Sequence, residues 1–184
     1  MNNTFQIAVF ASGTGTTLQT LIDSQDRYGY RVALVITNRE CMALDRAAKA
    51  DIPTLQTKDW KMIDNALNEH EVQLVVLAGF LAIIPQWICE KWEKRIINIH
   101  PSLLPKHGGK GMYGIRVQEA VLAAGDKEAG CTVHYVSAEV DGGGIIAQEA
   151  IAVAADDTPE SLAERVQQAE KALLPQVVGN FVEG

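Results

Sequence analysis

The segment INIHPSLLPKHGGKGMYG, residues 97–114, places an asparagine and a histidine two positions apart at the end of an apolar run. Side chains at i and i+2 of a strand project from the same face, so Asn98 and His100 are expected to point together into the following loop. Asn98 offers an amide N–H donor, and His100 can give or take a proton near neutral pH. The pair could form half of an oxyanion and proton-transfer site. A lone histidine at a strand end is more often structural, and the neighbouring asparagine is what favours catalysis.

A carboxylate that could complete this site lies in the segment EVDGGG, residues 139–144. Asp141 beside His100 would favour the imidazolium and fix the orientation of its ring. The alternative is that Asp-Gly only makes the turn between two strands, and the spacing alone favours this alternative. His134, in TVHYV, is expected within a strand as a hydrogen-bonded core residue or as a support for the site.

A glycine turn in ASGTGTTLQ, residues 11–19, suits an anion. Its two glycines allow a tight turn, and the amides and hydroxyls near Gly15, Thr16 and Thr17 lie at an expected helix N-terminus, where a phosphate is favoured. The dinucleotide fingerprint is incomplete because Leu18 occupies the third glycine position, and the lysine of the P-loop is missing. A glycine turn capped by threonine is the equally supported alternative.

These candidate residues require a scaffold, and the first hundred residues supply one. Short apolar runs alternate with helical patterns, which predicts right-handed crossovers and an α/β fold with a doubly wound, mostly parallel sheet. The expected strands are 6–12, 30–37, 53–57, 74–79 and 95–100, and the expected helices are 16–25, 42–50, 59–70 and 85–93. Ligands of such sheets bind at the carboxyl ends of the strands, so both glycine segments are expected to face one crevice.

The pattern changes after residue 100. A helix is expected around 116–124, followed by antiparallel edge strands over 131–137 and 145–153. The last helix opens at DTPE, where proline suits the first helical position. Its expected apolar stripe consists of Leu162, Val166, Ala169, Leu173 and Val177. Glu170 lies near the border of this stripe, where a glutamate is usually solvated.

Length and charge limit the function classes. The 184 residues suit a single domain, 1–184, and the formal charge of -7, from 16 Lys and Arg against 23 Asp and Glu, argues against a general binder of nucleic acid or anionic membranes. Three widely spaced cysteines predict neither a disulfide framework nor a metal site, which fits a cytoplasmic location. The N-terminus lacks signal-peptide features, and the longest apolar run, 74–84, is too short to span a bilayer.

INIHPSLLPKHGGKGMYG, with VVLAGF before it and GCTVHYVSAEVDGGGII after it, resembles the folate-dependent formyltransferases. ASGTGTTLQ and RVQQAEKALLP narrow the resemblance to members whose acceptor is phosphoribosylglycinamide (glycinamide ribonucleotide). The resemblance spans nearly the whole chain and implies a Rossmann-like formyltransferase fold. It also implies transfer of a formyl group from 10-formyltetrahydrofolate to the acceptor amine, without a metal, in de novo purine biosynthesis.

The resemblance implies roles for several groups of residues. The catalytic residues would be Asn98, His100 and Asp141. The acceptor would be bound by Gly15, Thr16 and Thr17 at its phosphate, and by Gln167 and Glu170 at its glycinamide end. The folate would be bound by Lys61, Leu81, Ala82, Ile83, Ile84, Asn98, Ser137, Ala138, Glu139, Val140 and Asp141. The chain departs from the family at Thr17, Ala82 and Gln118, where asparagine, a basic residue and histidine are frequent, and in its longer loop 107–114.

Relatives with the same catalytic residues are the nearest alternatives. Methionyl-tRNA formyltransferases carry a further C-terminal domain for tRNA. Formyltetrahydrofolate hydrolases carry an N-terminal regulatory domain. Neither of these extra domains is expected in this acidic chain. Sugar-nucleotide formyltransferases are not separated by length. A non-catalytic nucleotide-binding module would leave Asn98, His100 and Asp141 without a role. The expected partners are therefore the two small-molecule substrates, with no nucleic acid or membrane, in a monomer or homodimer.

Overall fold

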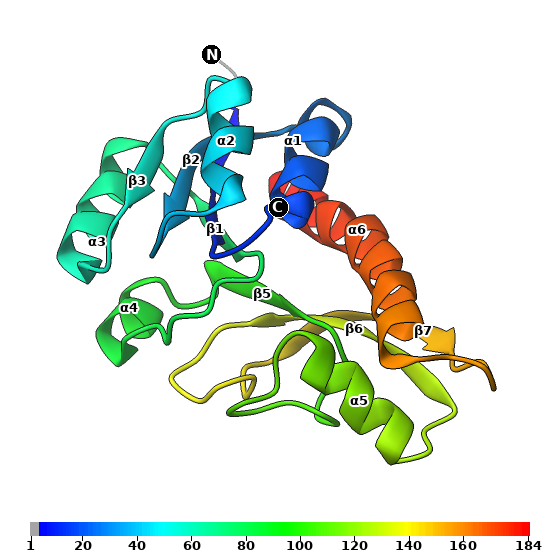
Figure 1. The fold of residues 1–184 in the computed structure, drawn as a ribbon. Coiled ribbons are helices and arrows are strands. Elements are labelled where there is room, and N and C mark those ends of the chain that lie inside the picture. Colours follow the sequence, from blue (N-terminus) through cyan, green and yellow to red (C-terminus); the bar gives the residue numbers. More distant parts are fainter. Residues whose placement is uncertain (1–3) are drawn as a thin grey trace.

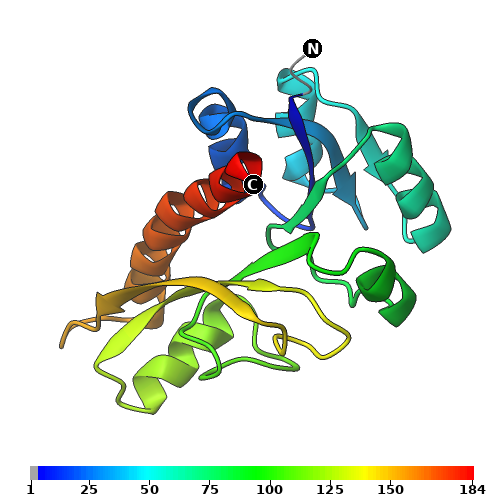
Figure 2. The same cartoon turned by 180° about the vertical axis from the view of Figure 1, so that it is seen from behind.

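The computed structural model describes residues 4–184 and contains a seven-stranded sheet with helices on both faces (Figures 1 and 2). The strands are β1 (Phe5–Ala11), β2 (Tyr30–Thr37), β3 (Thr54–Gln56), β4 (Leu74–Leu77), β5 (Ile96–His100), β6 (Glu128–Tyr135) and β7 (Ile145–Ala152). The helices are α1 (Thr16–Tyr28), α2 (Met42–Lys49), α3 (Trp60–Glu69), α4 (Gln86–Lys91), α5 (Ile115–Ala123) and α6 (Pro159–Glu183). Residues 1–3 lie outside the described residues. The first residues of the N-terminal segment, in which the sequence shows no signal-peptide features, therefore have no structural description here.

The strand order is β3-β2-β1-β4-β5-β6-β7. The first five strands are parallel, β6 pairs antiparallel with β5, and β7 pairs antiparallel with β6, which confirms the predicted mixed sheet. The order reverses at β1, because β2 and β3 lie on one side of it and β4 on the other. The loops after β1 and β5 leave the carboxyl ends of their strands, where a sheet of this kind binds ligands.

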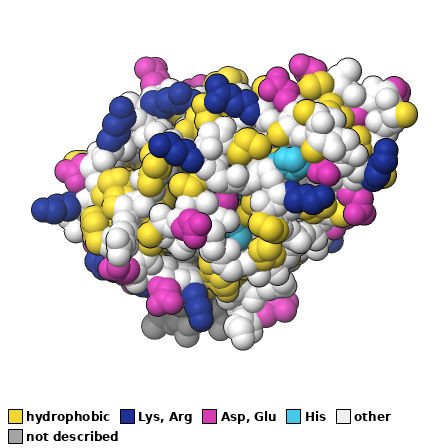
Figure 3. Space-filling view, turned by 90° about the horizontal axis from the view of Figure 1, so that it is seen from below, with side chains coloured by type: hydrophobic (Ala, Val, Ile, Leu, Met, Phe, Trp, Pro, Cys, Tyr) yellow, Lys and Arg dark blue, Asp and Glu magenta, His cyan; other side chains and the backbone are white. Residues whose placement is uncertain are grey.

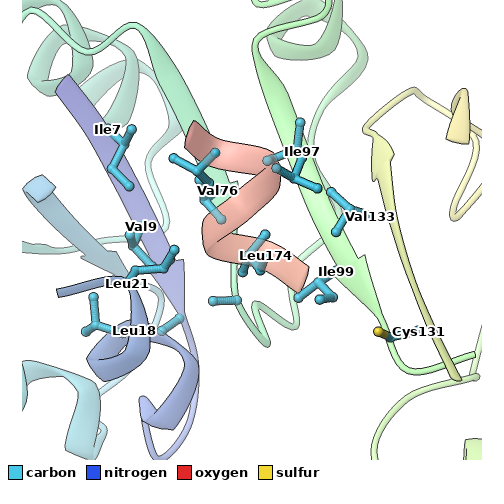
Figure 4. Close-up of a cluster of buried hydrophobic side chains, with 14 of the residues drawn as sticks. Ile7, Val9, Leu18, Leu21, Val76, Ile97, Ile99, Cys131, Val133 and Leu174 are labelled. Carbon is cyan, nitrogen blue, oxygen red and sulfur yellow. The ribbon is translucent and has the colours of Figure 1, made fainter. Parts of the chain in front are cut away.

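Different helices cover the two faces of the sheet because strand side chains alternate in direction. Ile7 and Val9 of β1 belong to a cluster that includes Leu18 of α1 and Leu174 of α6 (Figure 4). Phe10, on the other face of β1, belongs to a second cluster with side chains of α3 and α4. All four residues of β4 are buried, as its continuous apolar run predicts. The central strands are therefore covered by side chains on both faces.

Element ends differ from the expected ones by up to three residues, and α6 differs in its buried side. The strand β6 begins at Glu128, earlier than the predicted 131, because pairing with β7 overrides the weak strand propensity of the KEAG segment. In α6, Leu173 is only partly buried, and Leu174 is fully buried instead. The reason is that the C-terminal half of α6 packs on α1, where Gly179 lies against Tyr28, so the buried side of the helix rotates along its length.

The surface and the helices provide two further observations. On the face drawn in Figure 3, acidic and basic side chains both occur, and hydrophobic side chains lie between them. Within residues 4–184, no helix combines the length and the apolar character that crossing a membrane requires.

Candidate active site

A cavity of about 810 Å³ lies at the carboxyl ends of β1, β4 and β5. The loops that follow these strands line it, together with the segment 109–118, the β6–β7 connection and one side of α6. The lining includes all three predicted catalytic residues, all five predicted acceptor-binding residues and the predicted folate-binding residues Leu81, Ala82, Ile83, Ile84, Ser137, Ala138, Glu139 and Val140. Lys61 is exposed in the first turn of α3 and is not part of this wall, so its contact with folate stays a prediction.

His100 is nearly buried at the end of β5, with 4% of its surface exposed. Its Nε2 lies 2.9 Å from the carbonyl oxygen of His107, which can only accept a hydrogen bond, so Nε2 carries a proton. Its Nδ1 lies 3.6 Å from Oδ2 of Asp141, and both residues line the cavity. Nδ1 is therefore the ring atom that can exchange a proton with a substrate.

Asp141 lies between two histidine rings. Its Oδ2 accepts a hydrogen bond of 2.9 Å from the amide of Gly109, and its Oδ1 lies 3.6 Å from Nε2 of His134. Burial alone would raise the pKa of Asp141, but the nearby His134 ring, the hydrogen bond from the Gly109 amide and the positive charge of His100 together outweigh burial and lower this pKa. Asp141 is therefore a charged carboxylate at neutral pH.

Asn98 is oriented by His134, which lies opposite it where β5 pairs with β6. Nδ1 of His134 lies 2.9 Å from the carbonyl oxygen of Tyr135 and carries a proton for that reason. Nε2 lies 3.1 Å from the Asn98 amide, and it either accepts from the amide nitrogen or, when protonated, donates to the amide oxygen. In both arrangements at least one N–H of Asn98 is free to donate to a substrate oxygen.

The loop after β1 turns its carbonyl groups away from the cavity. The carbonyl oxygens of Ser12 and Thr14 accept hydrogen bonds of 2.7 Å from Nε of Arg39 and of Arg46, respectively. The carbonyl oxygen between them, that of Gly13, accepts from the backbone amide of Ala43 at 3.2 Å. Three successive carbonyl groups are thus held by the β2–α2 loop and by α2.

The amides of the same loop form an anion cradle, which we define as the backbone N–H groups of residues 13–17. The hydrogen bonds made among residues 4–184 leave these amides without an acceptor, and they stand at the N-terminus of α1 beside the cavity. Gly15 has a left-handed backbone with φ 71°, and a Cβ there would lie 2.8 Å from Cα of Ala43. Only glycine fits at this position, and the cradle suits a phosphate group.

Gln167 and Glu170 approach the anion cradle from α6. Nε2 of Gln167 lies 3.4 Å from Oγ1 of Thr16, which links the helix to the cradle. Burial raises the pKa of Glu170 to about 7, and the charge of Lys171 opposes this effect. A carboxyl group with such a pKa can hold or release a proton near neutral pH, so it is suited to receive an amine.

The raised pKa of Glu170 makes a prediction about stability. Between pH 4.5 and about 7 the unfolded chain has lost this proton while the folded chain keeps it, so the stability contributed at this position falls as the pH rises. The variant Glu170→Gln is expected to gain stability relative to the parent protein by about 2–3 kcal/mol between about pH 5 and pH 8. Urea unfolding at both pH values measures the change.

The control for this prediction is Glu164→Gln, which makes the same substitution at an exposed position of α6. Its difference from the parent protein is expected to be independent of pH. An equal pH dependence in both variants would contradict the assignment of the raised pKa to Glu170.

One wall of the cavity is formed by apolar side chains that are open to solvent. Leu81 and Ile83 are 54% and 70% exposed, and Val140, which also lines the cavity, is 43% exposed. Large hydrophobic side chains that line a cavity while facing solvent are typical of ligand-binding sites. Ser12 fixes this wall, because its hydroxyl accepts a hydrogen bond of 3.0 Å from the amide of Leu81.

Sequence reasoning missed two contributions to the site, those of His107 and Gly109. Both act through backbone atoms, and residue types carry no signal for such contacts. Gln118 also lines the cavity, and within the part of the chain that the structure describes its buried Oε1 has no hydrogen-bond partner. Among the described residues no group of three or more His, Cys, Asp or Glu side chains is arranged to hold a metal ion.

Comparison with known proteins adds independent evidence. Residues 5–178 match the model of the formyl transferase family. The chloroplastic phosphoribosylglycinamide formyltransferase of Arabidopsis thaliana is 39% identical over 191 residues, which cover 97% of this chain and 65% of that protein. The trifunctional purine biosynthetic protein adenosine-3 of Bos taurus is 42% identical over 191 residues, which cover 97% of this chain and 18% of that protein.

A crystal structure of phosphoribosylglycinamide formyltransferase from Anaplasma phagocytophilum has the same fold, with a TM-score of 0.91 and 39% identity over 98% of this chain and 88% of that chain. The chain spans about two thirds of the length of the plant relative and less than a fifth of the bovine one. The family match over nearly all of the sheet and the likeness of the whole fold agree with the resemblance in the motifs, and the chain belongs to the formyl transferase family.

Proposed function

We propose that this chain transfers a formyl group from 10-formyltetrahydrofolate to the amine of phosphoribosylglycinamide, giving formylglycinamide ribonucleotide and tetrahydrofolate. The observation that carries the proposal is that one cavity combines an anion cradle, a carboxyl group suited to an amine, an oxyanion donor with a histidine–aspartate pair, and an apolar wall. Each feature matches one chemical group of the two substrates. The names of the relatives in the plant and in Anaplasma phagocytophilum support the same reaction.

Different residues of the cavity act in different steps of the reaction. The uncharged amine attacks the formyl carbon, and the formyl oxygen becomes negatively charged. Asn98 donates its free amide N–H to this oxygen, and His100 donates from Nδ1. Asp141 takes up the proton that the amine loses and passes it to the departing folate nitrogen, through a water molecule. A cytoplasmic location and a monomeric or homodimeric state stay predictions.

The anion cradle makes a prediction about affinity. Arg46 donates a hydrogen bond to the Thr14 carbonyl and so holds the loop that carries the anion cradle. Arg46→Met is expected to release this loop and to raise the KM for the ribonucleotide about tenfold, with kcat within about twofold. A charge-assisted hydrogen bond of about 1.5–3 kcal/mol accounts for this change. Steady-state kinetics with the ribonucleotide as the varied substrate measure it.

The control is Arg27→Met, which removes an arginine from the exposed last turn of α1, far along the helix from the cradle. Its KM for the ribonucleotide is expected to equal that of the parent protein. If Arg46→Met changed kcat but left this KM unchanged, the proposed cradle would be wrong.

The experiment that tests the function is a spectrophotometric assay of folate product release from a 10-formyl folate donor, with and without phosphoribosylglycinamide. Release that requires the ribonucleotide is the expected result. Equal release without it would show a hydrolase. No release in either case would reject the transfer to this acceptor and favour a sugar-nucleotide acceptor or a non-catalytic binding module.

A further inference from the structure

His100 and Asp141 are both held by the short backbone segment 107–109. The carbonyl oxygen of His107 accepts from Nε2 of His100 at 2.9 Å, and the amide of Gly109 donates to Oδ2 of Asp141 at 2.9 Å. These two backbone groups determine where the ring and the carboxylate lie relative to each other. The distance of 3.6 Å between His100 Nδ1 and Asp141 Oδ2 therefore depends on the conformation of this segment.

The segment has a conformation that the chain does not adopt without support. His107 has φ 53°, in the left-handed region, and Gly109 has φ 93°. A left-handed backbone is uncommon for a residue other than glycine and persists where the surroundings fix it. A Cβ added to Gly108 would lie 2.4 Å from the Leu104 side chain, so the segment is also packed closely against the preceding loop.

The side chain of His107 supplies the support. Its Nε2 lies 2.7 Å from Oδ2 of Asp126, in the turn between α5 and β6, and both side chains are largely buried, with 16% and 18% of their surfaces exposed. This contact is the main cause that lowers the pKa of Asp126. Lys106 also reaches Asp126, with 3.2 Å between Nζ and Oδ1, but its side chain is 67% exposed. The histidine is the better anchor because its ring is enclosed.

The His107–Asp126 pair lies outside the active-site cavity. It lines a separate cavity of about 430 Å³, and none of the described residues that line this second cavity also lines the first. The two side chains therefore cannot contact the substrates, and any influence on the reaction passes through the backbone. Ser102 strengthens that connection, because its hydroxyl donates to the carbonyl oxygen of Lys106 at 2.6 Å.

We propose that His107 and Asp126 are positioning residues, which anchor the segment 107–109 so that its carbonyl and amide hold His100 and Asp141 in the reactive arrangement. This inference rests on the proposed formyl transfer, since it concerns the rate of that reaction. A displacement of about 1 Å in a catalytic group can lower a rate about a hundredfold, so loss of the anchor is expected to lower kcat and leave substrate affinity unchanged.

Three variants at the surface of the second cavity test the proposal. Asp126→Ala removes the acceptor of His107, and its kcat is expected to fall about tenfold or more with both KM values unchanged. Asp126→Asn keeps an oxygen that can accept from His107, and it is expected to retain kcat within about threefold of the parent protein. Lys106→Gln removes only the exposed ion pair, and it serves as the matched control with unchanged kcat.

Two further measurements separate positioning from a general loss of structure. His107→Gly keeps a backbone that adopts positive φ freely but lacks the ring, so a matching loss of kcat reports the missing anchor rather than strain. Nitrogen-15 spectra of the histidine rings follow the Nε2 proton of His100 without any substrate. In Asp126→Ala this proton is expected to exchange with solvent faster than in the parent protein and in Lys106→Gln.

The outcomes distinguish this inference from the proposed function. An active parent protein with unchanged kcat in Asp126→Ala and in His107→Gly would overturn the positioning role, as would equal losses in Asp126→Ala and Lys106→Gln. An inactive parent protein would reject the proposed function alone. In that case the ring spectra still decide whether Asp126 controls His100, and an unchanged proton exchange in Asp126→Ala overturns the inference.

Discussion

Replacing His100 with alanine is expected to lower kcat by about 10²–10⁴, which is the usual contribution of a positioned acid–base group. The reason is that Nδ1 of His100 lies beside Asp141 in the cavity wall, so alanine removes the proton donor and leaves the carboxylate without this partner. The KM values are expected to change little, because the anion cradle and the apolar wall keep their shapes. Steady-state kinetics with both substrates measure the two quantities separately.

The fold of this variant is expected to survive. The ring packs at the end of β5 and not among the apolar side chains of the two main clusters, and its loss leaves the carbonyl of His107 with only the longer contact of 3.5 Å from the Ser102 hydroxyl. Such a loss costs about 1–3 kcal/mol. His70→Ala, at the C-terminus of α3, is the matched control, and it should leave kcat unchanged. A near-normal kcat in His100→Ala would show that this histidine is structural.

The positions of Asn98 and His100 could be predicted from the sequence because they depend on local rules. The period of two along a strand places both side chains on one face, and the alternation of strands and helices places the end of β5 at the ligand-binding edge of the sheet. The structure confirms the mixed sheet that this reasoning requires. Only short-range regularities, which the residue types show, and the general right-handedness of crossovers are needed.

The position of Asp141 could not be predicted in the same way. By spacing alone, Asp-Gly in EVDGGG is best explained as a turn, and the role of Asp141 came from the resemblance to a family. The structure brings it to 3.6 Å from His100 because β6 pairs with β5, with His134 opposite Asn98, so the connection after β6 passes over the end of β5. Strand register depends on contacts distant in sequence, and the local pattern does not contain them.

For Glu170, the sequence pattern predicts a different environment from the one in the structure. Its place near the border of the apolar stripe of α6 predicts a solvated side chain, but burial raises its pKa to about 7. The difference arises because α6 packs across β6 and β7, and the helix period says which side is apolar but not how deeply the border is covered. Lys61, which the resemblance alone suggested, lies outside the cavity wall, and its role stays a prediction.

Replacing Asn98 with alanine is expected to lower kcat by about 10²–10³, the usual effect of removing one oxyanion donor. The amide is held by His134 with 3.1 Å between Asn98 Nδ2 and the ring Nε2, so it is oriented before the substrate binds and needs no reorganisation in the transition state. The KM values are expected to stay within about threefold, because a donor aimed at a developing charge contributes little to ground-state binding. Asn68→Ala, on the exposed side of α3, is the matched control.

The double variant Asn98→Ala with His100→Ala separates a joint role from two independent ones. If both side chains donate to the same oxygen, the first substitution already loses most of the stabilisation, so the double variant is expected to be only a few times slower than the worse single variant. Independent roles would multiply the two losses to about 10⁴ or more. Since Asn98 and His100 leave β5 on one face and line one cavity, the structure favours the joint role, and fully multiplied losses in the measured kcat values would contradict it.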